Sequence, residues 1–123
     1  MGQYYSYMNI QTNDEYKIKK ITDKYEISLP VCELCVRENE LEELVKELFE
    51  ADSSVTVISS TSNIDVDPYV YVCIIRNEKY ESHYIGELYD EDDFENLVYG
   101  GLIDSIPEWL ELVDSLIEDN ESI

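Results

Sequence analysis

The segment YVYVCII, Tyr69–Ile75, decides the fold of this 123-residue chain. Its side chains are apolar or aromatic at every position, and such residues are enriched in β-strands. Successive side chains of a strand point to opposite faces of the sheet, so a strand without polar positions is covered on both faces. We therefore predict a central strand with packed structure on each side of the sheet.

A second strand is expected directly after this one. Asn77 and Glu78 suit a tight turn, and Tyr80 and Tyr84 recur along the segment that follows. The pattern predicts a β-hairpin over residues 67–90.

Three other segments repeat apolar residues at the i, i+3, i+4 spacing of a helix with one buried face. Asn39 is a candidate N-cap for the first helix, the second begins near Asp92, and Ser105 with Glu108 has the spacing of a capping box in the third. The apolar stripes are Leu41, Leu44, Val45, Leu48 and Phe49; Phe94, Leu97 and Val98; and Ile106, Trp109, Leu110, Val113, Leu116 and Ile117.

The remaining segments are predicted to be extended or turns. Strands are expected at YYSYMNIQ (4–11), at the Lys-rich YKIKKI (16–21), which suits a sheet edge, at YEISLPVCELCV (25–36) and at SSVTVISS (53–60), with a loop at STSN (60–63). The order of strands, helix, strands and two helices predicts one α+β domain over residues 1–123. It has a largely antiparallel sheet of about five to six strands and three helices, two of them C-terminal.

The charge of the chain is strongly one-sided. Asp and Glu number 29 against eight Lys and Arg, a formal charge of -21, and residues 77–123 alone hold fifteen acids against Lys79, which is -14. Self-repulsion works against the compact state, so fold stability does not explain this excess. A basic partner does, and the most basic protein surfaces are those that bind nucleic acid. Nucleic acid itself is not an expected ligand, because its phosphates would be repelled.

Some of the acids are explained by local structure. Asp90 to Asp93 precede and open a helix, where negative charge complements the helix dipole. Acids at helix C-termini oppose the dipole, and Lys46 is the only basic residue near them in the sequence. These acids are Glu47, Glu50 and Asp52 in the first helix, and Glu118, Asp119 and Glu121 in the last. These positions are expected to serve a partner.

The last helix carries an acidic stripe that resembles a row of phosphates. Glu111, Asp114, Glu118 and Glu121 recur at spacings of three and four on one flank, although a plain solvated face is the alternative explanation. Tyr80, Tyr84, Tyr89 and Tyr99 lie among acids and suit contacts with arginine, or ordinary strand propensity. The candidate partner-binding residues are Glu87, Tyr89, Asp90, Glu91, Asp92, Asp93, Glu95, Tyr99, Glu111, Asp114, Glu118 and Glu121.

No motif of catalysis or of cofactor binding is found in the sequence, so we expect a protein that is not an enzyme and has no cofactor. Cys32 and Cys35 form a single C-x-x-C, and Cys73 with His83 could complete a zinc site. In a strand the first two cysteines would point to opposite faces, which favours reduced thiols over a metal site.

Neither a secretory signal nor a membrane span is expected, and a cytoplasmic location is predicted. The lysine-rich segment Lys17–Lys24 could contact an acidic face of a second copy, which makes a homodimer one arrangement to test.

The chain resembles the small, Tyr-rich, strongly acidic α+β proteins of phages and mobile elements that act as DNA mimics, among them antirestriction and anti-CRISPR proteins. Residues 69–97 resemble the ArdA-type antirestriction pattern, in which a hairpin leads to Gly-x-Trp and an acidic helix start; here Gly86-Glu87-Leu88 has Leu in place of Trp. The resemblance implies an inhibitor that occupies the basic DNA channel of a defence nuclease.

The sequence thus predicts a non-enzymatic nucleic-acid mimic whose partner is a basic nucleic-acid-binding protein, with a CRISPR effector as the first target to test and a restriction nuclease as another. The main alternative is an immunity protein or antitoxin that neutralises a basic nuclease toxin. A metal-binding or redox protein and an acidic protein adapted to high salt are further alternatives.

Overall fold

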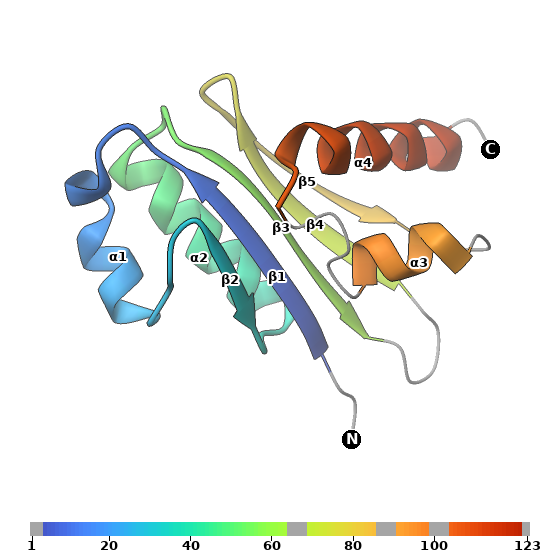
Figure 1. Cartoon of the computed structure of the whole chain (residues 1–123), viewed down its shortest axis with the longest axis horizontal. Helices are drawn as coiled ribbons and strands as arrows, with labels where there is room; N and C mark the ends of the chain where they lie inside the picture. The colour runs from blue at the N-terminus through green and yellow to red at the C-terminus, as the bar shows by residue number, and fades with distance from the viewer. Residues whose placement is uncertain (1–3, 64–68, 86–90, 99–103, 122–123) are drawn as a thin grey trace.

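The structure is a computed structural model that describes residues 4–63, 69–85, 91–98 and 104–121. Figure 1 shows a sheet between two layers of helices. The elements in chain order are β1 (Tyr4–Gln11), the 3-10 turn η1 (Glu15–Lys17), α1 (Lys19–Lys24), β2 (Val31–Leu34), α2 (Glu38–Ala51), β3 (Thr56–Asn63), β4 (Tyr69–Arg76), β5 (Lys79–Ile85), α3 (Glu91–Val98) and α4 (Ile106–Glu121).

The sheet is antiparallel throughout and has the strand order β2-β1-β3-β4-β5. Strand β4 pairs with β3 on one side and β5 on the other, and its residues from Val70 to Ile75 are all buried. The prediction of an internal strand covered on both faces is confirmed, as is the α+β class.

Each face of the sheet has its own core. On one face, Met8, Val57 and Cys73 pack against Leu41 and Leu44 of α2. The other core joins Ile58, Val72 and Ile74 to Leu97 of α3 and to Trp109 and Val113 of α4. Figure 1 shows α1 and α2 on one side of the sheet and α3 and α4 on the other. The acidic outer surfaces of α2 and α4 therefore face opposite ways.

The three predicted helices are present. In α2 the buried positions are Leu41, Leu44, Val45 and Leu48, and in α4 they are Ile106, Trp109 and Val113. Helix α2 begins after Arg37 and not after the predicted cap Asn39, because the backbone N–H of Arg37 donates to the Glu40 side chain. None of the helices in the part of the chain that the structure describes is long and apolar enough to cross a membrane.

The strand predicted at residues 16–21 is wrong. This segment forms η1 and α1, since the Asp14 side chain accepts a hydrogen bond from the backbone N–H of Tyr16 and starts the turn. Ile18 and Thr22 are buried and Ile21 is half-buried, which is the i, i+3, i+4 pattern of a helix. The alternation of Lys and Ile concealed this spacing. The edge strand next to it, β2, has only four residues and starts after Pro30.

The loop predicted at residues 60–63 is also wrong, because β3 continues to Asn63. Polar residues are stable inside a sheet when their hydroxyls are hydrogen-bonded. Ser60 donates to the backbone oxygen of Leu97, and Thr61 donates to that of Val36. The hairpin turn is confirmed: Asn77 and Glu78 have φ of 54° and 60°, as the two central residues of a type I′ turn require.

Candidate functional site

The acids of this chain far outnumber the cations that could neutralise them. With 29 acids and eight basic residues, 29 − 8 = 21 acids have no intramolecular counter-charge even if every basic residue binds one. Four basic side chains form ion pairs with acids among the described residues. These pairs are Lys19–Asp23, Lys24–Glu47, Lys46–Glu42 and Arg76 with both Glu81 and Asp114.

The outer face of α4 presents carboxylates to solvent. Glu108, Glu111 and Glu118 are exposed, and none of their carboxylates has a hydrogen bond or ion pair with another residue of the described chain. Glu111 and Glu118 are seven residues apart, which places them on the same side of the helix, about 10.5 Å from each other along its axis. This row is the part of the predicted acidic stripe that stays open to a partner.

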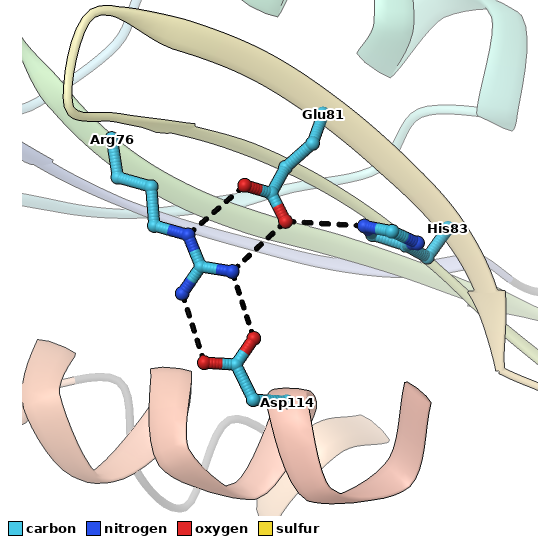
Figure 2. A network of polar contacts seen from close by, with 4 residues as sticks. All are labelled: Arg76, Glu81, His83 and Asp114. Atoms are coloured by element: carbon cyan, nitrogen blue, oxygen red, sulfur yellow. Dashed lines mark hydrogen bonds and ion pairs between the residues drawn. The ribbon is translucent and has the colours of Figure 1, made fainter. Parts of the chain in front are cut away.

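Asp114 does not belong to that open row. Its carboxylate binds the Arg76 guanidinium through two hydrogen bonds, from Nη1 at 2.9 Å and from Nη2 at 2.8 Å (Figure 2). Arg76 also donates to Glu81 from Nε at 3.0 Å and from Nη2 at 2.9 Å, and His83 Nε2 lies 3.1 Å from Glu81. We infer that Asp114 chiefly joins α4 to the β4–β5 hairpin and contributes less charge to a partner than expected from the sequence.

The electrostatics of this network agree with its geometry. The hydrogen bonds from Arg76 lower the pKa of Asp114, and burial opposes them. Burial alone would raise the pKa of Glu81, but the hydrogen bonds from Arg76 and His83 outweigh burial and lower it. Both carboxylates are therefore ionised at neutral pH and hold the guanidinium between them.

The end of α2 is better compensated than its sequence suggests. Glu47 binds Lys24 Nζ at 2.8 Å and accepts a hydrogen bond from the Tyr25 hydroxyl. Asp52 accepts from the backbone N–H and the hydroxyl of Ser54, at 3.0 and 2.6 Å. The expectation that Lys46 alone compensates these acids is wrong for Glu47, because α1 brings Lys24 from 23 positions away. Glu50 remains exposed.

The remaining predicted contact residues lie partly outside the described part of the chain. Asp92 and Glu95 are exposed on α3. The other predicted contact residues, or their side chains, lie outside the described part of the chain: Glu87, Tyr89, Asp90, Glu91, Asp93, Tyr99 and Glu121.

The tyrosines predicted to contact a partner separate into two kinds. Tyr80 is half-buried with its hydroxyl 3.5 Å from the Cys73 sulfur, whereas 64% of Tyr84 is exposed. Both point to the α2 side of the sheet, where the Tyr84 ring lies against that of Tyr71 with 4.6 Å between centroids. The Tyr71 hydroxyl in turn donates to Glu42 Oε2 at 2.9 Å. An exposed tyrosine thus lies beside α2, which the sequence alone did not indicate.

The three cysteines do not form a common site. Cys73 is buried on the α2 side of the sheet, and burial raises the pKa of its thiol to about 11. His83 is on the opposite face, since Ser82 is the residue across from Cys73. Cys32 is half-buried and Cys35 is exposed beyond the end of β2. Within the described residues no three His, Cys, Asp or Glu side chains are grouped so that they could hold a metal ion.

Comparison with known proteins finds no matching family, no matching curated protein and no matching solved structure.

Proposed function

We propose that this protein is a non-enzymatic inhibitor that binds the basic nucleic-acid channel of another protein in place of nucleic acid. The target class that we favour is a defence nuclease, with a CRISPR effector as the first candidate. The observation that carries the proposal is the row of solvent-exposed carboxylates on α4 that no basic residue of the described chain neutralises.

The spacing of this row suits a channel built for phosphates. Glu111 and Glu118 stand about 10.5 Å apart along the helix. Phosphates of one DNA strand rise about 3.4 Å each along the axis, so every third phosphate repeats at about 10.2 Å. Basic side chains that follow one strand of DNA therefore meet negative charges at an axial spacing close to that of Glu111 and Glu118.

Net charge supports the same proposal through the rate of association. A protein of charge -21 is steered toward a positively charged channel, and this attraction weakens as salt screens it. The acidic surface of α2, on the other side of the sheet, extends the negative field around the molecule.

The direct test is competition for DNA binding. A purified CRISPR effector is mixed with labelled target DNA, and the bound fraction is measured by fluorescence anisotropy as the protein is added. We expect the protein to displace the DNA. The double variant Glu111→Lys and Glu118→Lys should displace the same fraction of DNA only at a concentration at least about tenfold higher, since each reversed contact is worth about 1 kcal/mol or more.

The matched control is the double variant Glu15→Lys and Glu33→Lys. It changes the net charge by the same four units at exposed acids of η1 and β2, away from α4. If both double variants lose inhibition equally, only net charge matters and the α4 surface is not the contact. If the unmodified protein displaces DNA from neither a CRISPR effector nor a restriction nuclease, even in dilute buffer, the proposal fails.

A further inference from the structure

Tyr84 is an exposed aromatic residue in a region where its neighbours are packed. It lies on β5, which pairs with β4 alone among the described strands, so the side chain stands on the edge strand of the described sheet. Of the described large hydrophobic side chains only Tyr84 and Tyr16 are exposed, at 64% and 85%. Tyrosines at such positions commonly contribute strongly to protein interfaces.

The Tyr84 ring is held in place by buried neighbours. It lies tilted by 44° on the ring of Tyr71, which is 4% exposed. Tyr71 is fixed by its hydrogen bond to Glu42, and Glu42 is fixed by Lys46 Nζ at 2.5 Å. Lys46 in turn lies 5.6 Å above the ring of Tyr80. Because this chain of contacts already orders Tyr84, the ring loses little conformational freedom when a partner binds to it.

Glu42 is linked to the exposed ring through Tyr71, whose hydroxyl donates to Glu42 and whose ring lies against that of Tyr84. Burial, and then the charges of Glu38 and Glu42, raise the pKa of the Tyr84 hydroxyl, so the phenol lies in the electric field of both. Glu38 and Glu42 are one helical turn apart on α2, a helix that contacts β5. Glu38 is half-buried and its carboxylate has no hydrogen bond or ion pair with a described residue, whereas the carboxylate of Glu42 binds both Lys46 and Tyr71.

We propose that Tyr84, Glu38 and Glu42 form a docking site for an arginine side chain of a basic partner protein, the guanidinium stacking on the Tyr84 ring and its N–H groups facing the carboxylates. This inference rests on the proposed function, because it names a second contact, on the α2 side of the sheet, for the same kind of partner.

Arginine fits this site better than lysine does. Its guanidinium is planar, stacks on aromatic rings and presents several N–H donors in one plane, whereas the lysine ammonium is a compact and strongly hydrated charge. The site should therefore distinguish the two cations, which a plain acidic surface would do only weakly.

The probes are two synthetic peptides of equal length, oligo-arginine and oligo-lysine. Their affinities for the protein are measured by isothermal titration calorimetry at low salt, and the contact surface is located by NMR chemical-shift changes. We expect the arginine peptide to bind more tightly and to perturb the amides of Glu38, Glu42 and Tyr84. Tyr84→Ala should weaken arginine binding by about threefold to tenfold and lysine binding by less than about twofold.

Two further variants make the test specific. Tyr16→Ala removes the more exposed tyrosine, which lies on η1, and should leave the affinities for both peptides within about twofold. Tyr84→Phe keeps the ring and should keep most of the affinity for the arginine peptide. Glu38→Gln should weaken the binding of the arginine peptide without unfolding the protein, and circular dichroism checks that the protein remains folded.

The inference is overturned if the arginine peptide does not bind, if it is not preferred to lysine, or if Tyr84→Ala and Tyr16→Ala behave alike. It is also overturned if the shift changes lie on α4 alone. Any of these results leaves the competition with DNA to be judged separately through Glu111 and Glu118, so the two proposals can fail independently.

Discussion

Asp114 on α4 receives two parallel hydrogen bonds from Arg76 at the end of β4, although 38 positions separate the two residues in the chain. The pair connects the last helix to the hairpin whose second strand carries Tyr84. In a chain of charge -21 the guanidinium is thus used internally, between Asp114 and Glu81. Such a use indicates that the position of α4 on the sheet depends on this ion pair as well as on the apolar core.

We expect Arg76→Ala to destabilise the fold by about 1–2 kcal/mol, because it removes charge-assisted hydrogen bonds and leaves Asp114 facing Glu81 without a cation. Urea denaturation followed by circular dichroism measures the change. Lys79→Ala is the control, since the ammonium of this exposed lysine on the same hairpin has no hydrogen bond or ion pair in the described chain and its loss should change stability by less than about 0.5 kcal/mol. Equal effects of the two substitutions would show that the pair contributes nothing.

The stabilisation by Arg76 should depend on pH. The pKa values of Asp114 and Glu81 are lowered in the folded state, so their contribution is present above the unfolded pKa values, near 3.9 and 4.3, and is lost as pH falls through the folded ones. The difference in unfolding free energy between the unmodified protein and Arg76→Ala should therefore be constant near pH 7 and shrink below about pH 4. A difference that grew in acid would contradict this assignment.

Added salt should stabilise this protein. The 21 uncompensated negative charges repel one another in the compact state, and salt at about 0.5 M reduces the Debye length to a few ångströms. A gain of about 1 kcal/mol would raise the melting temperature by roughly 4 °C in a domain of this size. Thermal melts in 20 mM and 500 mM sodium chloride measure the shift, with uncharged sucrose as the control for solvent effects. A lower melting temperature in salt would mean that attractive ion pairs dominate over the repulsion.

The three thiols should differ in reactivity toward iodoacetamide. Cys35 is exposed and should be alkylated first at pH 8, whereas Cys73 should stay unmodified because it is buried and its pKa is raised to about 11. Mass spectrometry of peptides after timed alkylation gives the order, and alkylation in 6 M guanidinium chloride should modify all three. Rapid labelling of Cys73 in the folded protein would show that the sheet opens readily on its α2 side.

Much of the fold could be predicted because its signals are local. The run from Val70 to Ile75 identified a strand covered on both faces, and the apolar stripes of α2 and α4 identified two helices, since backbone geometry sets the spacing of side chains on each face. The segment at residues 16–21 was misjudged because its lysines alternate with isoleucines while its buried positions follow a helical spacing. Thr61 was assigned to a loop because the backbone oxygen of Val36, which accepts its hydrogen bond, lies elsewhere in the chain.

The sequence predicted the excess of negative charge and an acidic stripe on the last helix that includes Glu111 and Glu118, but not which carboxylates lack an ion pair. The sequence alone determined that most carboxylates of this protein lack a counter-ion, because that follows from counting. Which of them are free was decided by the tertiary structure: Arg76 reaches Asp114, Lys24 reaches Glu47, and Glu111 is left in solvent. Ion pairs form between groups that the topology of the sheet brings within a few ångströms, and that distance is not encoded in the spacing of residues along the chain.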